Sequence, residues 1–501
     1  MNLENIIPQL SRNKLAIYWL RNGIFSLALA GVYSIILVML RTPMLVNLFL
    51  NTEIFRSALV IHVNLSILVW LMSVTACVWS YNLESMTFSI TCVIIAFIST
   101  ALIALSPFCG QNFPVMNNYI PMLENIIFIL GISLFGVSVL LFALYTLWNC
   151  CKISYFNSLI NFTILSTAIM WVLVWVCFIW SYCQLQEIIK LVPVDIEFYY
   201  ELLFWSGGHL LQFIYTQILI LVMTVLFHVW IGKELRFKKL YLALLYLNFV
   251  ISIAAISGHL LYDIIDAEFK EYYTKQMKYG GGIAPVLSLI VMFYELVTAN
   301  PTNITSSLRG DTLVATKQSR TLIRNGLLRR AYALLAMTDT SLLWINTNSR
   351  VSYIKTTIIC SSMLFLSGGF IGILITGMSV TIPAHYHGSI VGISVAFMGF
   401  CFLLCDDKQQ KNSYFSAAIM TITIGQMLHI IALLFAGGYG VLRKTPWVEM
   451  PVTNKLLMGI MGGGGGIAIV GGLMFVIICG RSILFKREFG IRICQFLSQI
   501  R

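Results

Sequence analysis

The sequence predicts an all-α membrane protein with about twelve transmembrane helices. Of its 501 residues, 59% are hydrophobic and only 10% are charged, whereas a soluble protein carries roughly 25% charged residues. Apolar runs recur along the whole chain, and each is near the length of about 20 residues that spans a bilayer core. The net charge of +12 is not gathered on a soluble domain, so nucleic acid is not an expected partner.

The predicted spans form one polytopic domain over residues 1–501, with its membrane part at about 22–482. We place them at 22–40, 58–80, 88–106, 124–147, 158–182, 203–230, 239–264, 281–298, 356–378, 385–404, 412–437 and 460–482. Most lysines and arginines fall in segments on the side of the N-terminus. The positive-inside rule puts this side, with both termini, in the cytoplasm or the mitochondrial matrix. We therefore expect a bacterial inner (plasma) membrane or mitochondrial inner membrane protein.

One long segment, residues 300–355, lies between predicted spans and is basic. Arg320, Arg324, Arg329 and Arg330 stand beside several leucines in it. Such a pattern predicts an amphipathic helix that lies on the anionic inner leaflet of the lipid bilayer. A segment that docks a partner protein is the alternative.

The twelve cysteines are scattered, mostly within apolar runs. Because no Cys-x-x-Cys or Cys-x-x-Cys-His motif occurs, the sequence encodes neither a zinc site of that type nor a covalent c-type haem. We expect these cysteines to pack as small apolar side chains.

Two histidines, His385 and His387, stand at the start of an apolar run that predicts a membrane helix. At 100° per residue, side chains two positions apart point about 200° apart. One helix face cannot bring both imidazoles to a single metal, but the two can bind different centres on either side of the helix.

Six of the seven histidines fall in the outer half of the predicted membrane, with only His228 near the inner side. The six are His62, His209, His259, His385, His387 and His429. Ionisable groups in a membrane are costly and tend to be functional. Neutral imidazole is a common ligand of haem iron and copper. The shared depth therefore predicts a metal or haem cluster.

These histidines, together with the spacing in Trp205-Ser206-Gly207-Gly208-His209, resemble subunit I of the haem–copper oxidase superfamily. That superfamily includes cytochrome c oxidases, quinol oxidases and nitric oxide reductases, and the resemblance covers nearly the whole chain. It implies a bundle of the subunit I type and three metal centres. The implied ligands are His62 and His387 for a low-spin haem, His385 for a high-spin haem, and His209 and His259 for copper or non-haem iron.

The resemblance also suggests supporting residues. Arg443-Lys444 is similar to the cation pair that holds haem propionates in the oxidases, and Arg56 is a further candidate. Ordinary snorkelling of cations at span ends is the alternative interpretation. Trp205 and Gln212 are candidates for the gas pocket and for proton transfer, whereas His429 matches a histidine without a ligand role.

Several positions depart from the oxidase pattern. Oxygen-reducing members carry a tyrosine on span six in one branch and on span seven in another. In this sequence the two positions are Phe213 and Ser252. Phe213 also fills the place of the glutamate of nitric oxide reductases. The oxidases have an acidic entrance to a proton path after span two, where this sequence has only Glu84. Span eight has no lysine between Ile283 and Thr298. The resemblance therefore implies a divergent member with features like those of nitric oxide reductases, or an unusual oxidase, and proton pumping by known routes is not expected.

Span seven keeps only one histidine of the usual pair, because Gly258 precedes His259. Asp263 comes four residues after His259, which would place both on one helix face. It is therefore a candidate third ligand or proton donor. The alternative is that Asp263 is solvated in the headgroup zone with Asp266 and Glu268.

The expected function is that of the catalytic subunit of a respiratory terminal oxidoreductase. Electrons would pass from the low-spin haem to the high-spin haem and second metal, where O₂ or NO is reduced. Cytochrome c or quinol would supply the electrons, through a separate subunit. The alternative is a haem protein for electron transfer or gas sensing that has lost the second metal, and a transporter with unrelated histidines is a third hypothesis.

Overall fold

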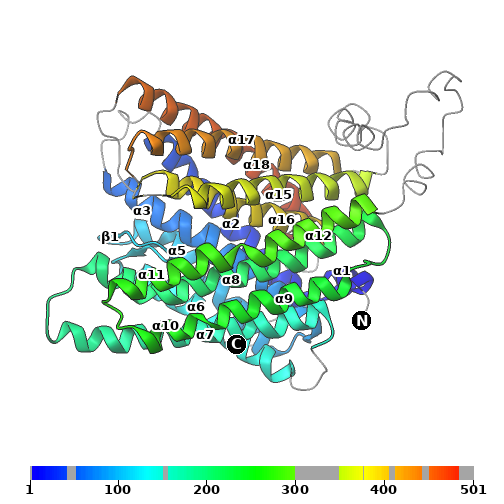
Figure 1. Ribbon diagram of the computed structural model, residues 1–501, viewed down its shortest axis with the longest axis horizontal. Coiled ribbons are helices and arrows are strands. Elements are labelled where there is room, and N and C mark those ends of the chain that lie inside the picture. The colour runs from blue at the N-terminus through cyan, green and yellow to red at the C-terminus, as the bar shows by residue number, and fades with distance from the viewer. Residues whose placement is uncertain are drawn as a thin grey trace, which may run out of the picture.

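A computed structural model describes residues 3–41, 52–150, 156–298, 349–375, 377, 379–405, 412–442 and 451–484. These ranges contain 12 helices that are long and apolar enough to cross a membrane. They run side by side in one bundle (Figure 1). All twelve predicted spans overlap these helices, so the predicted fold class is confirmed.

The described residues contain the following helices. In chain order they are η1 (Leu3–Asn5), α1 (Ile6–Arg12), α2 (Lys14–Arg41), α3 (Thr52–Val63), η3 (Asn64–Val69), α4 (Trp70–Trp79), η4 (Ser80–Asn82), α5 (Thr87–Leu105), η5 (Ser106–Phe108), α6 (Ile126–Cys150), α7 (Leu159–Ile189), α8 (Ile196–Ile231), α9 (Lys238–Ile253), α10 (Ala255–Leu261), α11 (Ala267–Gln276), η6 (Met277–Gly281), α12 (Ile283–Thr298), α15 (Ser349–Ile373), α16 (Thr381–Cys405), α17 (Asn412–Gly438) and α18 (Val452–Leu484).

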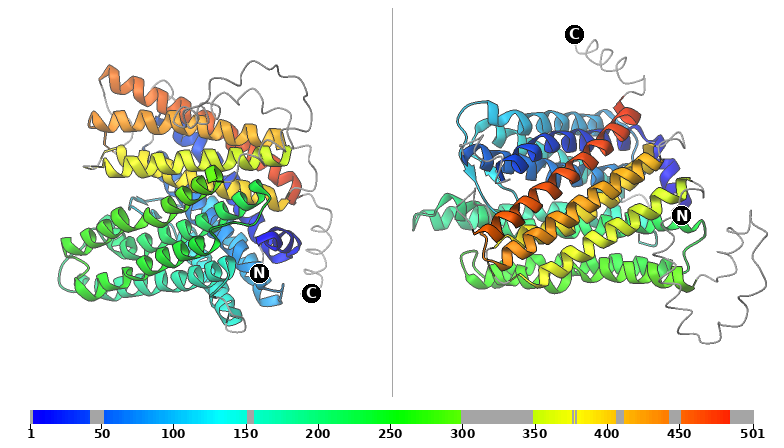
Figure 2. Two further views of the ribbon diagram at one scale, coloured as in Figure 1. Left: turned by 45° about the vertical axis from the view of Figure 1, so that its right-hand side comes forward. Right: turned by 90° about the horizontal axis from the view of Figure 1, so that it is seen from above.

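Helices α8 and α16 form the centre of the bundle. The most apolar stretch of α8 is 94% buried and that of α16 is 83% buried, against 33% for α2. An apolar membrane helix can be surrounded by lipid or by other helices, and the burial of α8 and α16 shows that other helices surround these two. Helix α8 packs against α7, α15 and α16, while α16 packs against α15 and α17. Both views of Figure 2 show α15, α17 and α18 stacked along one side of the bundle.

A short hairpin closes one end of the bundle. Strands β1 (Pro114–Val115) and β2 (Met122–Leu123) pair in antiparallel register, and α1 lies at the opposite end (Figure 1). The turn between the strands is held by Asn117, whose Oδ1 accepts hydrogen bonds from the backbone N–H groups of Tyr119 and Ile120 at 3.1 and 2.9 Å. The turn therefore presents Tyr119 in a fixed position above the helices.

Spans seven and eight differ from the prediction. Span seven breaks at Ala254 into α9 and α10 and ends at Leu261, not at residue 264. Span eight begins at Ala267, well before the predicted residue 281, because its first ten residues are a largely polar helix that hydropathy alone does not detect. A turn of π-helix, η6, joins this helix to α12.

Two predictions fall on residues outside the described ranges. They are the amphipathic helix within 300–355, of which 300–348 are not described, and the cation pair Arg443-Lys444.

Candidate functional site

The side chains of His385 and His387 face different neighbouring helices. Nδ1 of His385 lies 2.7 Å from the carbonyl oxygen of Gly368 on α15. The ring of His387 instead contacts that of His429 on α17, with 4.5 Å between ring centroids. The two imidazoles thus diverge from α16, which is the arrangement that two separate centres require.

Glycines bring α15 close enough to α16 for the His385 contact. A Cβ atom on Gly368 would lie only 2.6 Å from the carbonyl carbon of Gly388, and one on Gly372 would lie 2.7 Å from Nδ1 of His385. Small residues of this kind let membrane helices approach closely. The imidazole of His385 is therefore held between two helix backbones.

His62 lies near the end of α3, at the border between α3 and the next helical segment. Its Nδ1 is 3.0 Å from the carbonyl oxygen of Ala30 on α2. The following turn, η3, is π-helical, and π-turns inside helices are frequent at functional sites.

His62 and His385 share one donor pattern. In each, Nδ1 contacts a backbone carbonyl, which makes it the N–H donor and leaves Nε2 with a lone pair. Within the described ranges, neither Nε2 has a hydrogen-bond partner, and both residues are half-buried. A ligating imidazole is oriented in this way, because its other nitrogen donates to a carbonyl. These residues fit a haem iron.

His209, on α8, has both ring nitrogens in hydrogen bonds. Nδ1 lies 2.7 Å from the carbonyl oxygen of Trp205, and Nε2 lies 2.8 Å from the hydroxyl of Tyr119. The ring of Tyr119 rests on Gly208, where an added Cβ atom would overlap with its Cγ. The hydroxyl reaches His209 only because residue 208 has no side chain.

His259, on α10, is also buried and lies close to this group. Its Nε2 is 2.9 Å from Oγ of Ser206, and its Nδ1 has no partner among the described residues. Tyr273 fills the space beside Gly258, where a Cβ atom would lie 2.6 Å from the tyrosine hydroxyl. That hydroxyl donates to the carbonyl oxygen of Ala255 at 2.6 Å.

The arrangement around His209 and His259 does not fit a metal ion with three protein ligands. Within the described ranges, no three His, Cys, Asp or Glu side chains lie close enough to hold one. The expectation that Asp263 shares a helix face with His259 is wrong, because α10 ends at Leu261 and Tyr262 is extended. Asp263 is exposed, and its backbone N–H donates to the carboxylate of Asp266 at 3.0 Å.

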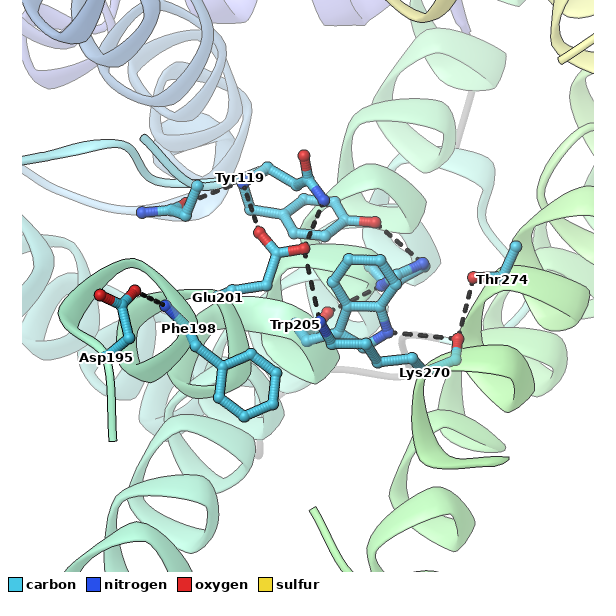
Figure 3. Close-up of polar contacts among 10 residues, drawn as sticks. Tyr119, Asp195, Phe198, Glu201, Trp205, Lys270 and Thr274 are labelled. Carbon is cyan, nitrogen blue, oxygen red and sulfur yellow. Dashed lines mark hydrogen bonds and ion pairs between the residues drawn. The ribbon is translucent and has the colours of Figure 1, made fainter. Parts of the chain in front are cut away.

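A cluster of polar side chains near Trp205 joins three elements, namely the hairpin turn, α8 and α11 (Figure 3). The carboxylate of Glu201 on α8 accepts hydrogen bonds from the side chain and backbone of Asn118 at 2.6 and 3.2 Å. Nζ of Lys270 on α11 is 3.7 Å from Glu201 and lies over the ring of Trp205. The indole N–H of Trp205 in turn donates to the carbonyl oxygen of Lys270 at 3.3 Å.

Two further predicted site residues, Gln212 and Arg56, make no hydrogen bond to the residues around His209 and His259. Gln212 is half-buried and makes no hydrogen bond to a described residue, and Arg56 is exposed on α3.

Two tyrosines reach the site from elements where the oxidase pattern does not place one. Tyr119 comes from the hairpin turn and Tyr273 from α11, whereas the pattern predicts a tyrosine at position 213 or 252. Their aromatic contacts with His209, at 4.8 and 5.5 Å between ring centroids, are tertiary and leave no local sequence signal.

No family model matches this chain. The uncharacterized protein RP382 of Rickettsia prowazekii (strain Madrid E) is 48% identical to it over 95% of this chain and 97% of that protein. The chain belongs to the family of RP382. An uncharacterized protein of Aquifex aeolicus (strain VF5) is 24% identical, with 77% of this chain and 83% of that protein covered.

Among solved structures, this chain is similar to a cryo-EM structure of a haem–copper terminal oxidase dimer. The TM-score is 0.65 over 94% of this chain and 84% of that one, at 13% identity. At this identity the likeness shows the fold alone. The chain is thus an integral, multi-pass membrane protein with a haem–copper oxidase-like fold.

Proposed function

We propose that this chain is the catalytic subunit of a membrane-bound respiratory oxidoreductase that reduces O₂ or NO. His62 and His387 would bind a low-spin haem and His385 a high-spin haem. The observation that carries the proposal is the divergence of His385 and His387 towards α15 and α17. The oxidase-like fold supports it.

The bound haems supply the redox chemistry. The reactions balance as O₂ with four electrons and four protons giving two waters, or two NO with two electrons and two protons giving N₂O and water. Cytochrome c or quinol is the proposed electron donor, and it would act through a separate subunit. The membrane would be a bacterial inner membrane or the mitochondrial inner membrane.

The protein's own residues hold and orient these groups. The carbonyl oxygens of Ala30 and Gly368 fix the tautomers of His62 and His385, so that Nε2 of each is the free electron-pair donor. Burial of α8 and α16 keeps water from the bundle interior. Protons consumed in the reaction must therefore arrive along polar side chains.

Gas consumption by the purified chain tests the proposal. The protein, reduced chemically, is mixed with NO or with O₂ in separate experiments, and the loss of each gas is followed. Loss of NO without O₂ uptake identifies a nitric oxide reductase, and the reverse identifies an oxidase. The proposal fails if neither gas is consumed by protein that contains both haems.

A second candidate function is haem-based electron transfer or gas sensing without a second metal. The engagement of both His209 nitrogens, with Tyr273 filling the space at Gly258, favours it. A copper or non-haem iron on His209 and His259 stays a prediction from the resemblance. Metal analysis separates the two, since copper, or iron in excess of haem, would contradict the second candidate.

A further inference from the structure

Glu295 is a buried carboxyl group inside a membrane helix. It lies on α12 and is 6% exposed. Its Oε1 accepts a hydrogen bond from the backbone N–H of Arg236 at 2.5 Å, and its Oε2 is 3.4 Å from the hydroxyl of Tyr241. No Lys, Arg or His forms an ion pair with it among the described residues. Because such a group is costly in a membrane, it is a candidate functional residue.

Arg236 belongs to the exposed turn between α8 and α9. This turn lies at the end of the bundle that carries α1 (Figure 1), which the positive-inside rule assigns to the cytoplasm or matrix. Glu295 is therefore buried but is hydrogen-bonded directly to a solvent-exposed residue on the inner side.

Helix α9 carries a buried polar stripe that begins at Tyr241, whose hydroxyl contacts Glu295. Tyr241, Asn248 and Ser252 are each 0% exposed. They are seven and four residues apart, so they lie on one face of the helix at successive heights. This face is directed at α8, because Asn248 bonds to the carbonyl oxygen of Phe213 at 3.1 Å.

The stripe is joined to α7 and α8 by hydrogen bonds. Nδ2 of Asn248 is 2.8 Å from Oε1 of Gln217, and the hydroxyl of Thr216 is 3.3 Å from Oδ1 of Asn248. Nε2 of Gln217 donates to Ser166 at 3.0 Å. These side chains are all buried. The network is thus anchored on three helices at the depth between Glu295 and the histidines.

The stripe leads towards the His209 group. Beyond Ser252, the carbonyl oxygen of Ala255 accepts the hydroxyl of Tyr273 at 2.6 Å. The ring of Tyr273 lies 5.5 Å from that of His209 between centroids. Buried polar groups therefore occur at intervals from the inner end of α12 to the histidine cluster near the hairpin end.

We infer that Glu295 takes up protons from the inner side and that the α9 stripe passes them to the gas-reducing site. This inference rests on the proposed function, which consumes protons. The hydroxyl groups of Tyr241, Thr216 and Ser252 both donate and accept, as proton transfer requires, and the amides of Asn248 and Gln217 orient them. Amide and hydroxyl side chains are sufficient to hold membrane helices together by hydrogen bonds. A carboxyl group such as Glu295 can in addition bind and release a proton.

The test compares Glu295→Gln and Glu295→Asp with Glu187→Gln. Glu187, on α7, is exposed and forms an ion pair with Lys190 at 2.7 Å, so Glu187→Gln removes one charge without touching the stripe. Each full-length variant is purified with its haems, and its optical spectrum is recorded first. Infrared difference spectra between the oxidised and reduced protein then report the C=O stretch of buried, protonated carboxyl groups, and gas turnover is measured in proteoliposomes.

We expect Glu295→Gln to keep both haem signals, to lose one carboxyl C=O band, and to slow turnover by roughly 10²-fold. Glu295→Asp should retain a carboxyl band and part of the turnover, and Glu187→Gln should match the wild type. Turnover at the wild-type rate in Glu295→Gln, or an unchanged infrared spectrum, would overturn the inference. Absence of haem in the wild type would instead overturn the proposed function.

A milder variant covers the case in which Glu295→Gln does not assemble. Thr216→Val is nearly isosteric and removes only the hydroxyl, which contacts Asn248 and the carbonyl oxygen of Phe213. We expect slower turnover with intact haem spectra and an unchanged Glu295 band. Wild-type turnover in this variant would contradict a role of the stripe.

Discussion

The hydroxyl of Tyr119 lies 2.8 Å from Nε2 of His209, although the two residues are 90 positions apart in the sequence. Because Nδ1 of His209 contacts the carbonyl oxygen of Trp205, Nε2 is the acceptor and the tyrosine is the donor. The nitrogen that would bind a second metal is thus covered by a side chain from the hairpin turn. This contact ties the turn to the centre of the bundle.

The first prediction concerns this hydrogen bond. Tyr119→Phe removes the donor and leaves Nε2 of a buried histidine without a partner, which should lower the free energy of unfolding by about 1–3 kcal/mol. Thermal unfolding in detergent measures the change. Tyr145→Phe is the control, since the Tyr145 hydroxyl contacts the sulfur of Met86 at an exposed position, and it should unfold like the wild type. Equal stability of the two variants would show that the contact is not formed.

The second prediction concerns the packing of the Tyr119 ring against Gly208. Gly208→Ala places a Cβ atom in the space that Cγ of Tyr119 occupies, so the ring must move and the hydrogen bond must break. Overpacking of this kind costs about 1–3 kcal/mol. Gly459→Ala, on α18, is the control because nothing lies within 4 Å of the added atom. A Gly208→Ala protein as stable as the control would contradict this packing of Tyr119 on α8.

The third prediction concerns the setting of His385. Gly372→Ala would place its Cβ atom 2.7 Å from Nδ1 of His385, whereas nothing lies within 4 Å of the corresponding atom on Gly369. Gly372→Ala should therefore shift or broaden the high-spin haem signal and leave the low-spin signal unchanged. Gly369→Ala, on the same helix, should have the wild-type spectrum. If Gly369→Ala changed the spectrum and Gly372→Ala did not, this placement of His385 would be wrong.

Much of the fold follows from the sequence, because hydropathy and span length do not depend on tertiary contacts. The divergence of His385 and His387 also follows, since it is a property of any α-helix at that spacing. The early end of span seven does not follow: Tyr262, Ile264 and Ile265 in the sequence suggest a helix that continues to residue 264, but the chain becomes extended at Tyr262. This local turn removes Asp263 from the face of His259.

The site is less predictable where its residues come from distant elements. Tyr119 and Tyr273 reach His209 from the hairpin turn and from α11, so no spacing along α8 reveals them. Glu295 escapes prediction for another reason. The oxidase pattern predicts a lysine in span eight, whereas the only acidic residue between positions 283 and 298 becomes notable through its burial and its contact with Tyr241.

The central claim is that His62, His385 and His387 hold two haems, and the optical spectrum of three purified histidine variants tests it most directly. In the wild type we predict one low-spin and one high-spin haem. His62→Ala should lose the low-spin signal alone and His385→Ala the high-spin signal alone, while His228→Gln, at the opposite end of α8, should retain both. A wild-type protein with no Soret band, or signals that persist unchanged in His62→Ala and His385→Ala, would contradict the claim.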